Sequence, residues 1–419
     1  MTIWQERGLA IAESETVKKV KLGWQVPSQS GNGTYVVNID NGEPFCTCQH
    51  FETTHKKCQH IYAVEFIVKK ERRPDGTEVE TRTTRITYAQ DWPVYNEAQT
   101  HEQEHFVELL RDLCNGIPQP EYIFGRPRLS LADIVFGLVY KSYTMMSGRR
   151  FMPDLREAEA KELVAKSASF ASNARYLGNP ELTPLLKALI EQSASPLKSI
   201  ETDFAVDSSG FATTTYDRWF DHKWGKMRSE AKWVKAHMMC GVKTHVVTSV
   251  EVSPTETADA PQFPKLVNAT AKTFNIKEVS ADKAYSSKKN LNAVVAVNGT
   301  PYVPFKSYSK GSQGMCKFDA IWQRMWHYYT FNREAFLAHY HKRSNAETTY
   351  SMIKMKFGGS VRAKTPVAQV NEVLCKILCH NICVLIQSIY ELGLEPTFWA
   401  GKVRQSEAPK ALIDFSLYQ

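Results

Sequence analysis

Residues 340–354 read Tyr340-His-Lys-Arg343-Ser-Asn-Ala-Glu347-Thr-Thr-Tyr-Ser-Met-Ile-Lys354. In an α-helix, positions three, four and seven residues apart return to the same face. The four numbered residues are therefore predicted to share one helical face that carries a carboxylate, two cations and a phenol. Taken alone, Arg343 and Glu347 are equally typical of an i,i+4 ion pair on a solvated helix, worth a few tenths of a kcal/mol.

Two aspartates upstream favour the functional alternative. Asp207 follows the apolar run Phe204-Ala-Val206 and precedes Ser208-Ser-Gly210, and Asp282 follows Val279-Ser-Ala281. Both are predicted to lie where a core strand meets a turn, which is where α/β sheets display functional groups. A lone aspartate there is more often a cap or turn residue.

Three carboxylates beside a basic helix suit a divalent cation. Mg²⁺ prefers oxygen ligands, and a pair of such ions can stabilise both oxygens of a displacement at phosphorus. Asp203 lies on the same strand face as Asp207 and is the main alternative for the first ligand. Asp207 is preferred because three apolar residues precede it and a turn is expected after it.

The chain around these residues alternates between strand and helix patterns. Short β-branched or apolar runs bounded by turn formers predict strands at 204–206, 244–250, 276–279 and 302–305. Helical spacing predicts helices at 101–114, from 130 onward, at 261–274, at 286–297 and beyond Trp322 to about Leu392. This order predicts a mixed α/β catalytic domain.

Positive charge is concentrated around the same helix. Between Pro301 and Lys364 the chain has eleven Lys and Arg against three acids, a surplus of eight that equals the net charge of all 419 residues. Such a segment attracts a polyanion such as DNA. A solvated basic face without a ligand is the alternative.

The set Asp207, Asp282 and Glu347, together with Y-x2-R-x3-E-x6-K at Tyr340, Arg343, Glu347 and Lys354, resembles the insertion-sequence DDE transposases of the Tyr-Arg-Glu-Lys signature group. The similarity covers about residues 128–392. It implies a ribonuclease-H-like fold and cleavage and strand transfer at transposon ends that depend on Mg²⁺ (or Mn²⁺). By the same resemblance the three acids hold the metal, and the other three signature residues bind DNA phosphates.

Four cysteine and histidine residues near the N-terminus have metal-ligand spacing. Cys46, Cys48, Cys58 and His60 form C-x-C-x9-C-x-H, which suits tetrahedral Zn²⁺. His50 and His55 lie inside the loop and are alternative ligands. The segment 23–66 resembles the SWIM zinc finger, which implies a structural site that binds DNA or protein. A closed four-ligand site leaves no position for a catalytic water.

The other cysteines and the bulk composition indicate where the chain acts. Cys375, Cys379 and Cys383 recur every four residues without a fourth ligand, which favours core packing. Nine cysteines without an export signal favour a reducing compartment. We expect no stretch of the apolar length needed to cross a bilayer, and the chain is predicted to be cytoplasmic and nucleoid-associated.

The predicted organisation has five parts. They are a SWIM-like zinc finger (1–70), a linker with one helix (71–127), a helical DNA-binding region (128–200), a ribonuclease-H-like DDE catalytic domain (201–395) and a C-terminal tail (396–419). The expected partner is double-stranded DNA, both transposon ends and target, bound by a homodimer or a larger assembly. Two alternatives remain open: an inactive transposase-derived regulator, and a nuclease that cuts without joining.

Overall fold

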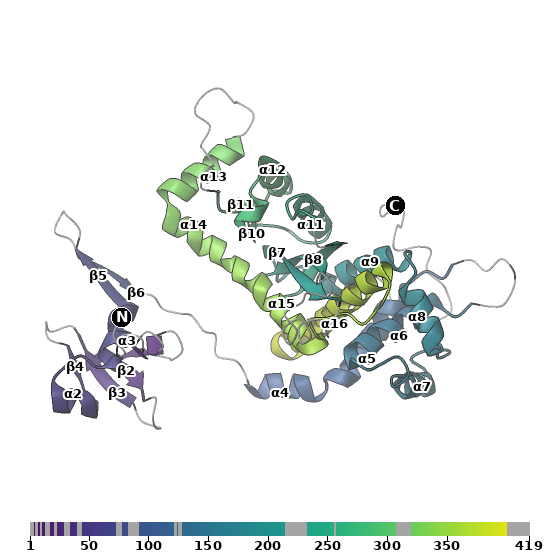
Figure 1. Cartoon of the computed structure of the whole chain (residues 1–419), viewed down its shortest axis with the longest axis horizontal. Helices are drawn as coiled ribbons and strands as arrows, with labels where there is room; N and C mark the ends of the chain where they lie inside the picture. The colour runs from purple at the N-terminus through teal and green to yellow at the C-terminus, as the bar shows by residue number, and fades with distance from the viewer. Residues whose placement is uncertain are drawn as a thin grey trace, which may run out of the picture. The chain divides into compact units, whose positions relative to one another are not determined.

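The structure is a computed structural model, shown in Figure 1. It describes residues 4, 7–8, 11–12, 17–20, 23–28, 34–39, 44–72, 78–82, 92–120, 124, 128–213, 233–254, 257–306 and 320–399. Contacts within the chain separate two compact units, Met1–Gln90 and Asp91–Gln419. Of the predicted tail, residues 400–419 lie outside the described residues, as do Lys310, Lys317 and Asp319 of the basic segment.

The described part of the first unit contains a small antiparallel sheet followed by short helices. Its strands are paired in the order β1 (Lys18–Val20), β2 (Gly23–Pro27), β3 (Thr34–Asn38) and β4 (Phe45–Cys46). Helices α2 (Gln49–Thr54) and α3 (Gln59–Ile67) follow. Trp24, Val26 and Val37 alternate inward and pack with Ile61 and Val64 of α3 in one buried cluster. After α3, β5 (Val68–Arg72) and β6 (Glu78–Arg82) pair as antiparallel strands.

The second unit is built on a mixed five-stranded sheet of order β11-β10-β7-β8-β9. β7 (Asp203–Ala212), β8 (Trp233–Gly241) and β9 (Val247–Pro254) are antiparallel neighbours. β10 (Glu278–Ala281) pairs with β7 in parallel, and β11 (Thr300–Tyr302) pairs with β10 in parallel. A mixed sheet with flanking helices confirms the predicted ribonuclease-H-like class.

Helices cover both faces of this sheet, as Figure 1 shows. On one side lie α11 (Phe263–Ala271) and α12 (Lys288–Ala296). On the other lie α15 (Ser344–Phe357) and the long buried α16 (Pro366–Leu392). The remaining helices are α4 (Trp92–Thr100), α5 (Glu102–Asn115), α6 (Leu131–Thr144), α7 (Met152–Ala160), α8 (Phe170–Leu177), α9 (Leu182–Ala194), α13 (Ala320–Phe331) and α14 (Arg333–Tyr340), with the 3-10 turns η1 (Ser195–Leu197), η2 (Lys283–Tyr285) and η3 (His341–Arg343).

Several local predictions are confirmed. Helix α5 coincides with the helix expected at 101–114, and α6 begins after Ser130, whose side chain accepts a hydrogen bond from the Asp133 amide. That contact satisfies one of the amide groups left unpaired at a helix start. Ser287 caps α12 in the same way through Asn290.

Other predictions are wrong. β7 continues past Asp207 to Ala212, so no turn follows Asp207. The strand expected at 244–250 begins only at Val247, and β8 was not predicted. Residues 340–354 are not one α-helix, because α14 ends at Tyr340 and a 3-10 turn precedes α15.

The expectation that no stretch has membrane-spanning length is also wrong for α16. By length and composition, Pro366–Leu392 could cross a bilayer, yet 78% of its most apolar window is buried inside the protein. It packs against α9, α6 and α5. Its apolar character is therefore that of a core helix, which is hydrophobic all round because neighbours surround it.

Candidate active site and zinc site

Asp207 and Asp282 are brought together by the register of two parallel strands. Ala281, the last residue of β10, pairs with Val206 of β7, so the next residues on each strand are Asp282 and Asp207. Neighbouring strands lie about 4.8 Å apart. β10 stops there while β7 continues, so Asp207 lies within its strand but at the end of the neighbouring one. The Asp282 carboxylate caps η2 by accepting the Lys283 amide at 2.6 Å.

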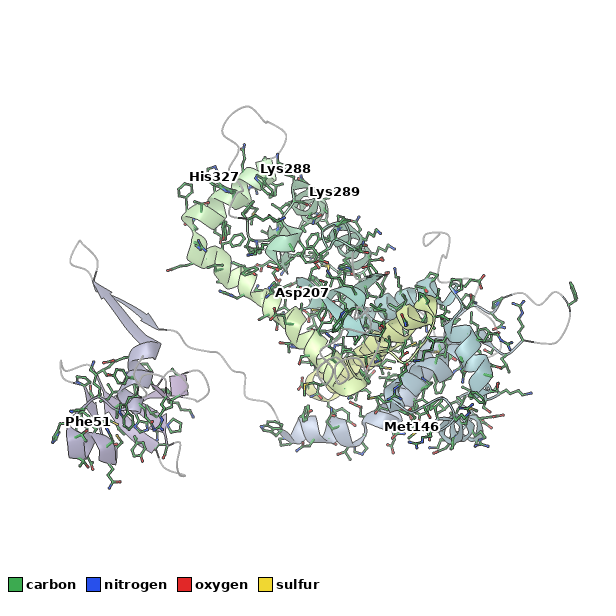
Figure 2. All side chains as sticks on the ribbon, viewed as in Figure 1. Phe51, Met146, Asp207, Lys288, Lys289 and His327 are labelled. Carbon is green, nitrogen blue, oxygen red and sulfur yellow. The ribbon has the colours of Figure 1, made fainter. Side chains whose placement is uncertain are left out.

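Glu347 reaches the same place from α15, which packs on β7 and β8. Arg343 connects Glu347 to Asp207. Its guanidinium donates to Asp207 Oδ2 at 3.2 Å and to Glu347 Oε1 at 2.6 Å. Figure 2 shows Asp207 where α15 passes the sheet. The pKa of Arg343 is raised. Burial alone would lower this pKa, but the hydrogen bond to Glu347 and the negative charge of Asp207 outweigh burial, and Tyr340 adds to the increase.

The acids also act on one another electrostatically. Burial raises the pKa of Asp207, the Ser208 amide and Arg343 oppose the shift, and the negative charges of Glu347 and Asp282 add to it. Oxygen-only donors are the set that Mg²⁺ or Mn²⁺ prefers. A cation would relieve this mutual repulsion, so the donor chemistry of the three acids suits a divalent metal. Among the described residues, only the Cys/His cluster of the first unit is already gathered at metal-ligand spacing.

An open groove runs from these acids along α15 and β7. Its lining combines carboxylates, hydroxyls and one ammonium group: Asp207, Ser208, Ser209, Glu347, Tyr350, Ser351, Lys354 and Met355. Lys354 Nζ donates to Ser209 Oγ at 2.6 Å, and burial lowers the pKa of this lysine. The buried Tyr350 donates to the carbonyl oxygens of Ala236 at 2.6 Å and Asp207 at 3.1 Å.

Of the predicted site residues, Asp207, Glu347 and Lys354 line this groove. Arg343 bonds the first two, and Asp282 follows the strand residue that pairs beside Asp207. Tyr340 lies at the end of α14, next to the 3-10 turn that contains Arg343. Ser209 and Tyr350 were missed. Both had a usable signal: Ser209 is two residues from Asp207 on the same strand face, and Tyr350 is one helical turn from Glu347.

Asp203, the alternative first ligand, has different partners. Its carboxylate accepts Lys342 Nζ at 2.7 Å, and the same ammonium bonds Glu278 Oε2 at 2.7 Å. His339 Nδ1 lies 2.9 Å from that Glu278 oxygen. Asp203 therefore belongs to an ion-pair cluster at the start of β7, about 13 Å of strand from Asp207 at the usual rise per residue.

The four predicted zinc ligands form one compact group. Cys46 lies on β4, Cys48 at the start of α2, and Cys58 and His60 where α3 begins. All four are buried, and their ligand atoms lie within 4.8 Å of one another. The neighbouring Cys46 thiol lowers the pKa of Cys58 to about 3. Buried soft donors in two pairs suit tetrahedral Zn²⁺.

The histidines considered as alternatives have other contacts. The His50 ring packs on Trp4, with ring centroids 4.2 Å apart, and His55 meets Phe51 edge-on. Cys375 and Cys379 are fully buried in α16, where burial raises the pKa of both thiols. They lie in the main hydrophobic cluster, with the partly buried Cys383 packed against it, which agrees with a packing role.

Comparisons with known proteins agree with this arrangement. Residues 198–382 match the family described as the transposase DDE domain. Residues 35–69 match the SWIM zinc finger. No solved structure matches the chain.

These two matches identify the domain types at residues 198–382 and 35–69. The chain combines a transposase DDE domain with an N-terminal SWIM zinc finger. A transposase-type function, DNA binding and a divalent metal follow from the first domain, and the Cys/His cluster with the second supports Zn²⁺.

Proposed function

We propose that this chain is an insertion-sequence transposase that cuts DNA at the ends of its element and joins the freed ends to target DNA. The observations that carry the proposal are that Arg343 bonds both Asp207 and Glu347, and that Lys354 lines the same groove as these two acids. The strand register adds Asp282 beside Asp207. Mg²⁺ or Mn²⁺ held by the three acids would supply charge stabilisation at the attacking and leaving oxygens of the phosphodiester.

The chain's own residues bind and orient the DNA. The Arg343 guanidinium offers a planar fork suited to phosphate oxygens, and the Lys354 ammonium supplies a point charge. Tyr340 adds a phenol next to Arg343. Tyr350 fixes the β7 backbone at Asp207 from within the core, so the acid's position is set by buried hydrogen bonds.

The predicted parts then have separate tasks. Residues 201–395 carry the chemistry, and the helical region 128–200 contributes further DNA contacts, for which Arg149, Arg150 and Arg175 are exposed. The finger (1–70), joined by the linker 71–127, binds DNA or protein. Because joining requires two ends in one complex, we propose a homodimer or larger assembly, which acts on cytoplasmic, nucleoid-associated DNA.

The test is incubation of purified protein with end-containing duplex and Mg²⁺, followed by sizing of the products. Asp207→Asn, Asp282→Asn and Glu347→Gln should each lower cleavage by about a thousandfold, since several kcal/mol of charge stabilisation are lost. DNA binding should survive, because basic side chains supply most of the affinity. A protein with two of these substitutions should cut no more slowly than one with a single substitution, since the three acids act as a unit.

Asp203→Asn is the matched control and should cut normally. Normal cutting by any of the three amide variants removes that residue from the site. Cutting without joining would establish a nuclease instead, and binding without cutting in the unaltered protein would establish a regulator.

A further inference from the structure

The edge of β7 beyond Asp207 lacks a neighbouring strand on the β10 side, within the part of the chain that the structure describes. Pairing with β10 ends at Val206, and the next contact on that side is a bridge from Ala212 to Ser360. The residues between are small at Ser208, Ser209 and Gly210. A strand edge of small residues lets another backbone approach closely.

A second open hollow lies beside this stretch of β7 and reaches to β8, the strand paired with β7 on its other side. It is lined by Ser208, Ser209, Gly210, Trp233, Lys235 and Lys354. Ser208, Ser209 and Lys354 also line the groove that contains Asp207 and Glu347. The two hollows therefore share part of their lining, including Lys354.

The far end of this hollow presents an aromatic ring and a second ammonium group. A Cβ at Gly210 would lie 3.2 Å from Trp233 Cε3, so glycine gives the indole room to lie across β7. Trp233 is half-buried. Lys235 pairs with Asp259, and its side chain keeps 24% of its surface exposed.

We propose that this hollow is a subsite for the nucleotide next to the scissile phosphate. Lys354 and Lys235 contact successive phosphates, and Trp233 stacks on the base. The inference rests on the proposed function, since it takes the acidic groove to hold the phosphate that is cut. The lining shared with that groove and cations from two elements favour a DNA strand over a peptide.

The experiment uses the full-length protein and end duplexes that retain zero to four nucleotides beyond the scissile position, shortened on one side at a time. Binding is measured by fluorescence anisotropy without divalent metal. Affinity should rise by about tenfold when the first nucleotide is added on one side, because stacking on an aromatic ring contributes that much. We call this gain in affinity on adding the first nucleotide the step. Trp233→Leu should abolish the step, and Trp233→Phe should retain most of it.

Trp92→Leu is the matched control, since Trp92 is exposed on α4, and it should keep the step. Lys235→Gln should reduce the step by a few fold. A full step in Trp233→Leu, or equal weakening at every DNA length, overturns the subsite. If Trp233→Leu fails to fold, loss of the step in a folded Trp233→Phe also overturns stacking.

Failure of the proposed function gives a different result. An affinity gain that depends on Trp233 in a protein that never cuts would keep nucleotide binding at Trp233 and reject the transposase mechanism. Cutting without any step would keep the mechanism and reject the subsite.

Discussion

The zinc cluster and the acidic groove differ in how far apart their residues lie in the sequence. All four zinc ligands fall within residues 46–60 and are buried in a unit with a small core. The acids come from residues 207, 282 and 347 and meet only because strand register and α15 packing bring them together. A short motif can define the first kind of site, whereas the second depends on the whole fold.

This difference predicts opposite responses to ligand loss. Cys58→Ser should remove stoichiometric zinc and unfold the first unit, since zinc binding supplies about 10 kcal/mol or more to such small domains. The second unit should melt as before, because none of its core involves the finger. Zinc content by elemental mass spectrometry and limited proteolysis of the two units are the measurements.

Cys383→Ser, at a half-buried thiol of α16, is the control and should leave zinc content unchanged. A first unit that keeps its protease resistance in Cys58→Ser, or a purified protein without zinc, would contradict the zinc assignment.

A smaller effect separates Asp203 from Asp207 within the second unit. Lys342→Gln leaves Asp203 and Glu278 without their shared cation, whose side chain is 30% exposed. The free energy of unfolding should fall by about 1 kcal/mol, the size expected for a partly exposed pair. Urea unfolding measures this, and cleavage should remain. Loss of cleavage in Asp203→Asn with unchanged stability would instead place Asp203 in the site.

The smallest expected effect concerns Lys354 at the boundary of the two hollows. Lys354→Ala should weaken end binding by a few fold and reduce the salt slope by about one unit, as one lost phosphate contact does. Burial lowers the pKa of Lys354. As pH rises, Lys354 should therefore lose its charge at a lower pH than an exposed lysine does. Above that pH, the difference in DNA-end affinity between the unaltered protein and Lys354→Ala should shrink.

Lys265→Ala, an exposed lysine on α11 at the opposite face of the sheet, is the control for this measurement. An unchanged slope in Lys354→Ala would make Lys354 an ordinary surface residue.

The sequence predicted the local features well. The four candidate zinc ligands, the helix that begins near residue 130 and the two domain types could all be identified from short patterns. Asp207 and Asp282 could be chosen as candidates because apolar runs precede them, and the structure places them side by side.

Features that depend on distant contacts were missed. The extension of β7 past Asp207 rests on pairing with β8, and His237 in β8 interrupts an apolar run. His237 is buried, and its Nε2 lies 2.9 Å from Ser253 Oγ of β9. No local sequence pattern reveals this contact. The break between α14 and α15 has no proline or glycine, and it coincides with Lys342 reaching Asp203 and Glu278.

The central claim is that Asp207, Asp282 and Glu347 form one divalent-metal site. Mn²⁺ binding to zinc-loaded protein without DNA, followed by calorimetry or electron paramagnetic resonance, tests it most directly. Each single amide variant should weaken Mn²⁺ binding by at least about tenfold, the equivalent of 1.4 kcal/mol for one lost oxygen ligand. Asp203→Asn should bind as the unaltered protein does. Unchanged affinity in any of the three, or loss in Asp203→Asn alone, would contradict the shared site.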